Sequence, residues 1–336
     1  MTEKKIIPTK EIKRIAVFTS GGDAPGMNAA VRAIVRNAVH NDLHIYGIMR
    51  GYEGMIDGNI RRLETTDVSN IIHRGGTILK TARSQRFLTP EGRKKAYENL
   101  IDNDIDALIA IGGNGTFTGA TKFIEEYPNV PIIGLPGTID NDLYGTDFTI
   151  GFDTAVNTSV QAVDKIRDTA DSHNRLFFVE VMGRHSGYIA LHTGIGGGAG
   201  GVLIPEEETT IDDLVRLLKR GAKRAKLFSI VIVAEGNHMG TVYDIAKKVE
   251  EQIDFYDDIK VTVIGHLQRG GSPSSFDRVL ASILGFSAVE ALLQGKTGVM
   301  AGIKNNSIHY TPFQEAITKR KSLNKDLLRM SHILAQ

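Results

Sequence analysis

The chain has 336 residues, of which 41% are hydrophobic and 24% charged, so it is long enough for two ordinary folded domains. Its 40 basic residues nearly balance its 39 acidic ones, and a net charge of +1 gives no global field for nucleic acid or an anionic membrane. The absence of cysteine excludes disulfides, thiolate nucleophiles and cysteine-ligated metal centres. Without a signal-peptide core or an apolar run near 18 residues, we expect a cytoplasmic protein without a membrane span.

Apolar runs and helical periodicity alternate along the chain. Residues 1–11 are expected to form a loose tail. Strands rich in valine, isoleucine and leucine that alternate with helices predict parallel sheets covered on both faces, hence an α/β fold. The expected strands are 12–22, 44–51, 106–113, 130–138, 175–183, 227–236 and 261–271, the expected helices are 24–41, 91–101, 116–127, 152–173, 210–225, 243–253 and 276–295, and 300–313 is expected to form a hairpin.

Glycine clusters at the ends of these strands, where α/β proteins bind their ligands. TSGGDAPGMN (19–28) and IGGNGT (111–116) each combine a strand end, a glycine turn and a helix start. Backbone N–H groups and the helix dipole make such a turn an anion site, although a strand–helix turn that binds nothing has the same form. Two such turns on one sheet favour phosphate binding.

PGTIDND (136–142) puts two carboxylates, Asp140 and Asp142, directly after a buried strand. A pair of this kind suits a general base beside a group that organises metal or water. A solvated turn capped by aspartate is the alternative. Because Thr138 precedes the pair and glycine loops flank it, we favour a functional site.

Several cationic side chains adjoin strand starts or ends, and they indicate an anionic substrate because guanidinium groups bind phosphate through two donors. Glu235, in the segment VAEG, suits a sugar hydroxyl. Together with the phosphate loops and the paired aspartates, these residues predict phosphoryl transfer to a phosphorylated, hydroxylated substrate. The cationic residues are Arg83, Arg175, Arg184, His266 and Arg269.

In this order, TSGGDAPGMNA, IGGNGT, GLPGTIDND, VMGRHSG and GHLQRGGSP resemble the bacterial ATP-dependent 6-phosphofructokinase family from about residue 12 to about 325. The resemblance implies the glycolytic transfer of the γ-phosphoryl group of ATP to the 1-hydroxyl of fructose 6-phosphate, with Mg²⁺, in a homotetramer whose active sites are shared between subunits. It also implies two similar three-layer αβα domains. The implied limits are 12–151 with 264–314 for the ATP domain, and 152–263 with a C-terminal helix at 315–336 for the sugar and effector domain.

The resemblance assigns roles residue by residue. Asp140 is the implied base, and Arg83, Thr138 and Arg184 are the implied partners of the transferring group. Arg175 and Lys260 are expected to reach in from a neighbouring subunit. The ATP residues are Gly22, Arg83, Ser84, Gly113, Asn114, Gly115 and Thr116, and the metal residues are Asn114 and Asp142. The sugar-phosphate residues are Thr138, Ile139, Asp140, Arg175, Met182, Gly183, Arg184, Glu235, Lys260, His266, Leu267, Gln268 and Arg269.

The family has a pyrophosphate-dependent branch, in which an acidic residue and a lysine replace two glycines. Here those positions are Gly115 and Gly137, so ATP is the expected donor. An aspartate at 115 would fill the space for the α-phosphate of ATP and would repel it.

Three departures from the family pattern stand out. Asn114 replaces an aspartate associated with Mg–ATP, which favours weaker metal binding and lower turnover and leaves a catalytically impaired paralogue as the alternative function. Lys260 replaces an arginine and loses a bidentate fork. The pocket that binds ADP or phosphoenolpyruvate has lost charge at Thr65, Asn70, Gly200, Leu227 and Phe228, so weak or altered allostery is expected. The effector residues that persist are Arg32, Arg36, Arg167, Arg224 and Lys226.

Overall fold

The computed structural model describes residues 11–172, 175–222 and 229–335, and within them the chain forms two compact units. The first unit comprises residues up to Thr138, Leu143–Gly151 and Gly271–Arg320, and the second comprises Ile139–Asp142, Phe152–Gly270 and residues from Lys321. Residues 264–270 therefore belong to the second unit and 315–320 to the first, unlike the expected limits. The expected tail is outside the described residues except for Glu11. The end of the expected helix 210–225 and the start of the expected strand 227–236 are also outside them.

The first unit has a mixed sheet of order β11-β10-β5-β4-β1-β2-β3, in which the central strands run parallel. β10 and β11 form the expected antiparallel hairpin, and β3 pairs antiparallel with β2. The strands are β1 (Arg14–Thr19), β2 (His44–Ile48), β3 (Ile60–Arg62), β4 (Ala107–Gly112), β5 (Ile132–Pro136), β10 (Val299–Lys304) and β11 (Ser307–Pro312).

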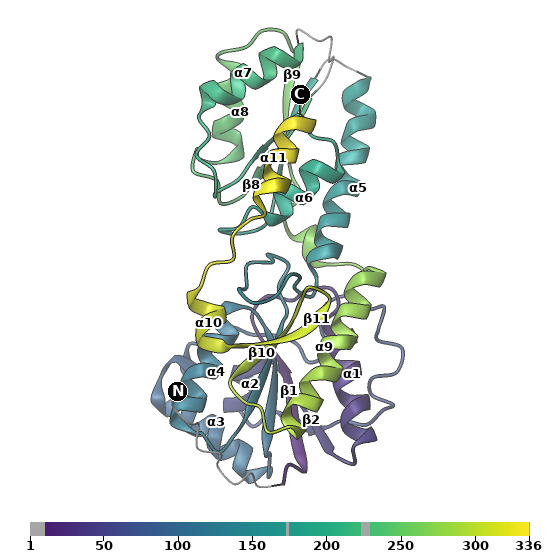
Figure 1. Cartoon of the computed structure of the whole chain (residues 1–336), viewed down its shortest axis with the longest axis vertical. Coiled ribbons are helices and arrows are strands. Elements are labelled where there is room, and N and C mark those ends of the chain that lie inside the picture. Colours follow the sequence, from purple (N-terminus) through teal and green to yellow (C-terminus); the bar gives the residue numbers. More distant parts are fainter. Residues whose placement is uncertain (1–10, 173–174, 223–228, 336) are drawn as a thin grey trace. The chain divides into compact units, whose positions relative to one another are not determined.

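Helices cover both faces of this sheet (Figure 1). In β1, Ala16 and Phe18 point into a core shared with α2, α3, α4 and α10, whereas α1 and α9 pack against each other over the opposite face. Thr89 caps α3 by accepting a hydrogen bond from Gly92 N, as expected of a threonine before a proline-led helix. The helices are α1 (Met27–His40), α2 (Gly51–Ile56), η1 (Arg86–Leu88), α3 (Pro90–Asp102), α4 (Asn114–Glu126), α9 (Ser275–Leu293) and α10 (Phe313–Thr318).

The second unit has a fully parallel sheet of order β7-β8-β6-β9. One face packs on α7 and α8 through Leu176, Phe178, Val231 and Val233, and α5 and α6 contact the sheet outside that cluster. α11 is the expected C-terminal helix, whereas the short β7 and α6 lack a strong sequence signal and were not expected. The elements are α5 (Phe152–Asp171), β6 (Arg175–Val181), α6 (Tyr188–Gly196), β7 (Gly201–Leu203), α7 (Ile211–Ala222), β8 (Ser229–Ala234), α8 (Val242–Glu250), β9 (Asp258–Val263), η2 (Gly265–Arg269) and α11 (Lys325–Leu334).

The fold class predicted from the alternation of strands and helices is confirmed: both units have parallel strands with helices on each face. Within the described ranges, no helix is both long enough and apolar enough to cross a membrane.

Candidate active site

In the first unit, the segments that follow β1, β4 and β5 are joined at one edge of the sheet. Ser20 N donates to Ile111 O at 2.9 Å, and Gly137 N donates to Gly112 O at 3.0 Å. Both predicted phosphate turns and the start of PGTIDND therefore meet at the carboxyl ends of parallel strands, where ligands bind in such sheets. This edge brings together Gly22, the 113–116 turn and Thr138.

The IGGNGT turn leads directly into α4, which begins at Asn114 after the N-cap Gly113. The N-cap residue is a glycine, which has no side chain to cap the helix, so backbone N–H groups at the helix start can donate to an anion. Thr116 Oγ1 donates to Ser20 O at 3.3 Å, and the buried Tyr52 hydroxyl donates to Thr116 O at 2.6 Å. The turn is thus fixed to the segment that follows β1 and to α2.

Gly115 and Gly137 differ in the space around them. A Cβ built on Gly115 meets nothing within 4 Å, whereas one on Gly137 would lie 2.9 Å from Ile111 Cγ2 and 3.0 Å from Met27 Cε. Gly115 is also exposed, so its face of the turn is open to a ligand. Gly137 is confined by the core, and a lysine there would require the strand ends to shift.

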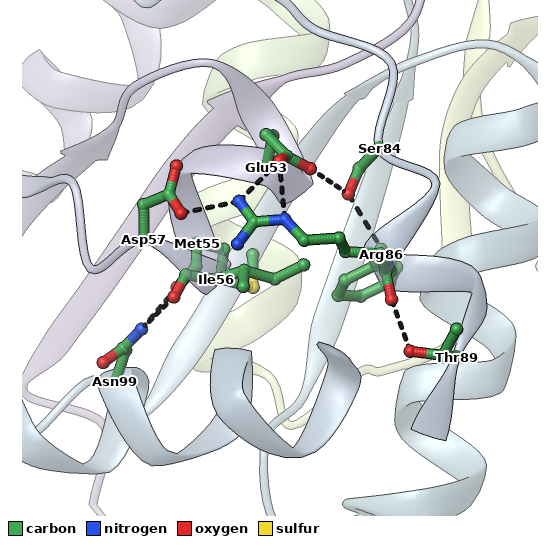
Figure 2. A network of polar contacts seen from close by, with 9 residues as sticks. Glu53, Met55, Ile56, Asp57, Ser84, Arg86, Thr89 and Asn99 are labelled. Atoms are coloured by element: carbon green, nitrogen blue, oxygen red, sulfur yellow. Dashed lines mark hydrogen bonds and ion pairs between the residues drawn. The ribbon is translucent and has the colours of Figure 1, made fainter. Parts of the chain in front are cut away.

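Arg83 lies in an irregular segment before η1, and its side chain is exposed. The expectation that it adjoins a strand was wrong, because β3 ends at Arg62 and β4 begins only at Ala107. The neighbouring Ser84 Oγ donates to Glu53 Oε2 at 2.5 Å and accepts from Phe87 N at 3.1 Å. Ser84 contact with ATP stays a prediction, and its hydroxyl has a structural partner (Figure 2).

In the second unit, the carboxyl ends of β6, β8 and β9 are bound to one another. Met182 N donates to Gln268 Oε1 at 2.8 Å, and Gln268 Nε2 donates to Ser159 Oγ at 2.8 Å. Glu235 N donates to Val181 O at 3.0 Å. Gln268 is 0% exposed, so both ends of its amide are satisfied within the protein. The predicted sugar residues at this edge are therefore assembled around a buried amide.

Arg184 occupies a strained turn after β6. Its φ of 59° is in the left-handed region, and its N–H donates to Glu235 Oε1 at 2.9 Å. A Cβ on Gly236 would lie 1.7 Å from Arg184 O, so only glycine permits this close approach. The turn thus orients Arg184 beside Glu235, and strain of this kind is frequent at functional sites.

Asp140 belongs to the second unit and is 8% exposed. Burial, followed by the Asp142 carboxylate, raises the pKa of Asp140 to about 6, although Arg269 and Arg184 act in the opposite direction. The main chain here is fixed because Ser186 Oγ donates to Asp140 O at 3.0 Å. A raised pKa near neutrality is the property expected of a general base.

The turn around Asp140 depends on residues that the sequence did not single out. Asn141 has a φ of 51° and accepts a hydrogen bond from Lys321 Nζ at 2.8 Å through its side chain. Lys321 also lies over the Tyr188 ring, 4.9 Å from its centroid. Asparagine tolerates the left-handed region, which is a usable signal, but nothing in the sequence links position 141 to 321.

Arg175 and Lys260 lie away from this edge. Arg175 is the first residue of β6, about 20 Å along the strand from the Met182 end. Lys260 is within β9, next to Phe177 in register, and its Nζ lies 2.6 Å from Asp258 Oδ2. The expectation that the cationic residues converge was wrong for Arg175, because the start and end of a parallel strand lie at opposite edges. That Arg175 and Lys260 reach a neighbouring subunit stays a prediction.

The GHLQRGG segment forms η2, a 3-10 helix that follows β9. His266 and Leu267 are exposed, and Leu267 retains 72% of its surface. Arg269 is half-buried and lies near enough to Asp140 to lower its pKa. The segment thus directs Gln268 inward and leaves His266 and Leu267 exposed.

The expected effector residues are only partly described. Arg32 is half-buried and Arg36 exposed on α1, and Arg167 donates from α5 to Gly198 O at 3.2 Å and also to Gly197 O. Arg167 therefore binds the carbonyls at the end of α6. Arg224, Lys226, Leu227 and Phe228 lie outside the described residues.

Among the described residues, histidine, aspartate and glutamate side chains do not form a group of three or more that could hold a metal. Mg²⁺ in phosphoryl-transfer enzymes uses one or two carboxylates and takes its remaining ligands from phosphates and water. Asp140 and Asp142, whose charges interact, fit that more limited role.

The first unit has two glycine turns of the phosphate-binding kind at the carboxyl edge of its sheet. The second unit has the buried Asp140 and the turn that joins Arg184 to Glu235. Together these features define a phosphoryl-transfer protein of the α/β class. The phosphofructokinase family model matches residues 14–292, and the chain belongs to that family.

Two curated relatives are similar over nearly the whole chain. The ATP-dependent 6-phosphofructokinase of Cytophaga hutchinsonii is 55% identical over 323 residues, which cover 96% of this chain and 98% of that protein. ATP-dependent 6-phosphofructokinase 1 of Thermus thermophilus is 55% identical over 324 residues, which cover 96% and 100%. The structure of phosphofructokinase from Saccharomyces cerevisiae matches with a TM-score of 0.88 and 38% identity over 96% of this chain and 48% of that one.

Proposed function

We propose that this protein is an ATP-dependent 6-phosphofructokinase, which transfers the γ-phosphoryl group of ATP to the 1-hydroxyl of fructose 6-phosphate. The observation that carries the proposal is Asp140, a buried carboxyl whose pKa is raised to about 6 among Asp142, Glu235 and two arginines. Relatives named ATP-dependent 6-phosphofructokinase at 55% identity support the same activity.

Asp140 accepts the proton of the 1-hydroxyl as that oxygen attacks the γ-phosphorus. A base with a pKa near 6 is mostly ionised at neutral pH and still has affinity for the proton. Arg184, held by Glu235, binds the sugar and the transferring group, and Arg83 neutralises charge that develops on the phosphoryl oxygens. The proton remains on Asp140 until the product leaves.

The sugar binds at the carboxyl edge of the second sheet. Met182, Gly183 and Glu235 contact its hydroxyl groups, and His266 and Arg269 on η2 bind the 6-phosphate. Arg175 and Lys260 complete the 6-phosphate site of a neighbouring subunit, which accounts for their place away from the carboxyl ends of β6 and β9.

ATP lies against Gly22 and the 113–116 turn. The open space beside Gly115 accommodates its phosphates and supports ATP over pyrophosphate as the donor. Mg²⁺, held by Asp142 and the phosphates with a weaker contribution from Asn114, supplies charge neutralisation when bound. The catalytically impaired paralogue is disfavoured, because Asp140, Arg83 and Arg184 are all present.

A homotetramer with shared active sites is part of the proposal. In the first unit, α9 exposes a stripe of large apolar side chains at helical spacing, and a surface of this kind marks a protein interface. The effect of ADP or phosphoenolpyruvate is weak or altered, through Arg32, Arg36, Arg167, Arg224 and Lys226. The side chains of the stripe, each between 41% and 59% exposed, are Phe276, Val279, Ile283, Phe286 and Leu293.

A coupled assay that measures turnover of fructose 6-phosphate with ATP and Mg²⁺, and in parallel with pyrophosphate, tests the proposal. We expect saturable turnover with ATP and none with pyrophosphate. Turnover with pyrophosphate alone would reassign the donor, and no turnover with either would favour the paralogue.

A further inference from the structure

Glu53 is a half-buried carboxylate on the short helix α2 that binds two residues of the segment after Lys80. Its Oε2 accepts from Ser84 Oγ at 2.5 Å, and its Oε1 accepts from Arg86 Nε at 2.7 Å. Figure 2 shows the carboxylate between these two partners. Both oxygens are therefore used, and each fixes a residue on either side of Gln85.

Arg86 is also bound by a second carboxylate, that of Asp57 at the C-cap of the same helix. Its Nη2 donates to Asp57 Oδ1 at 2.6 Å. The Asp57 side chain is 44% exposed and that of Glu53 only 18%, so water weakens the Asp57 contact more. Hydrogen bonds from Ser84 and Arg86 lower the pKa of Glu53, which keeps this carboxylate ionised at neutral pH. Glu53 is thus the stronger of the two anchors.

The helix that carries Glu53 is itself tied to its surroundings. Asn99 Nδ2 donates to Met55 O at 2.9 Å and to Ile56 O at 2.7 Å. At the position before Glu53, Tyr52 binds the 113–116 turn through Thr116 O and stacks on Phe87 with ring centroids 3.9 Å apart. A carboxylate on such a helix is a fixed point relative to the phosphate turn.

Arg83 immediately precedes Ser84, and it lies in a segment that is neither helix nor strand. On the C-terminal side, Arg93 holds η1 independently by donating to Phe87 O at 3.0 Å and Leu88 O at 2.9 Å. The contact between Ser84 and Glu53 is therefore the side-chain anchor next to Arg83. We propose that Glu53 is a positioning residue that sets where the Arg83 guanidinium lies. This inference rests on the role proposed above for Arg83.

The test is a double-mutant cycle on kcat with Glu53→Ala, Arg83→Ala and the combination. Because misplacement of a catalytic group lowers the rate strongly, we expect Glu53→Ala to lower kcat about tenfold with little change in KM for fructose 6-phosphate. In the Arg83→Ala background, Glu53→Ala should lower kcat less than about twofold, because the guanidinium that Glu53 positions has been removed. Asp57→Ala, which removes only the exposed Arg86 contact, should lower kcat less than about twofold.

Equal losses from Glu53→Ala in both backgrounds, or an unchanged kcat, would overturn the inference. If Glu53→Ala does not fold, Glu53→Gln replaces it, because glutamine still accepts from Ser84 but lacks the charge for Arg86. It should show a smaller loss with the same dependence on Arg83.

Amide hydrogen exchange over residues 81–88 gives a measurement that does not require turnover. Exchange should be faster in Glu53→Ala than in the parent and unchanged in Asp57→Ala. If the parent protein does not phosphorylate fructose 6-phosphate, the proposed function is wrong. The amide hydrogen exchange of residues 81–88 then decides by itself whether Glu53 orders this segment. Unchanged exchange in Glu53→Ala would refute the positioning role.

Discussion

The carboxyl edges of the two sheets, one in each unit, are built in different ways. The edge of the first unit exposes backbone: glycine turns, an uncapped helix start at Asn114 and open space at Gly115. The edge of the second unit exposes side chains that a buried amide, Gln268, and a strained turn at Arg184 hold in place. Backbone donors suit phosphates of any nucleotide, whereas oriented side chains suit one sugar phosphate. On the proposed function, the difference predicts that donor choice depends on space and that acceptor choice depends on a rigid polar network.

The largest expected effect on activity is that of a substitution at Asp140, in the second unit. Loss of the base in the variant Asp140→Asn should lower kcat by on the order of 10²- to 10⁴-fold. The folded-state pKa of Asp140 is raised, so its stabilising contribution is lost as pH rises through about 6, and ionisation at neutral pH opposes folding. The variant should therefore be more stable than the parent at neutral pH, by on the order of 1–3 kcal/mol, and should unfold at a higher temperature.

Steady-state kinetics and thermal unfolding at about pH 7.5 measure both effects. Asp212→Asn, at an exposed position on α7, is the matched control and should change neither quantity. An active Asp140→Asn variant would contradict the assignment of the base.

Gln268→Leu tests the buried network of the second edge. Leucine has a similar size but leaves Met182 N–H and the Ser159 hydroxyl without this partner, which should destabilise the protein by about 1–3 kcal/mol. KM for fructose 6-phosphate should rise several-fold while KM for ATP stays within about twofold. Urea unfolding and initial-rate kinetics measure these changes, and an equal rise in both KM values would remove the distinction between the two edges.

Gly115→Asp tests the open space of the first edge. The carboxylate should raise KM for ATP by about tenfold through bulk and repulsion of phosphate. Gly115→Ala adds a Cβ that meets nothing within 4 Å, so it should have little effect on KM for ATP. This control separates the effect of the aspartate's charge from the effect of added bulk. If the aspartate variant binds ATP as well as the parent does, Gly115 does not select the donor.

The acidic limb of the kcat–pH profile tests the electrostatics around Asp140. Activity should fall as pH decreases through about 6, because the base must be ionised. Asp142 raises the pKa of Asp140, so Asp142→Asn should move the limb to lower pH. A limb that moves to higher pH or stays in place would contradict this charge coupling.

The smallest expected effect is a gain of activity when Asn114 is replaced by aspartate. Asn114→Asp restores a charged oxygen ligand and should raise kcat a few-fold and reduce the Mg²⁺ concentration required for half-maximal rate. Titration of Mg²⁺ at saturating ATP measures both kcat and the Mg²⁺ concentration required for half-maximal rate. No change, or a fall, would show that this position does not limit metal use.

Local sequence patterns were sufficient for the strand–helix alternation and for the segments that carry glycine turns and Asp140. Apolar runs and glycines at strand ends are local signals, and the parallel sheets follow from them. The contacts of Gln268 with Ser159 and of Asn141 with Lys321 join distant residues, so no local pattern could reveal them. Arg175 was misplaced because proximity to a strand does not say which end of the sheet a residue occupies.

Phosphorus-31 NMR of one reaction mixture, containing the protein, Mg²⁺, ATP and fructose 6-phosphate, tests the central claim most directly. We predict that ADP and a new phosphate ester at carbon 1 of the sugar appear in equal amounts, with fructose 1,6-bisphosphate as the product. Formation of ADP with inorganic phosphate and no sugar bisphosphate, or no consumption of ATP, would contradict the account.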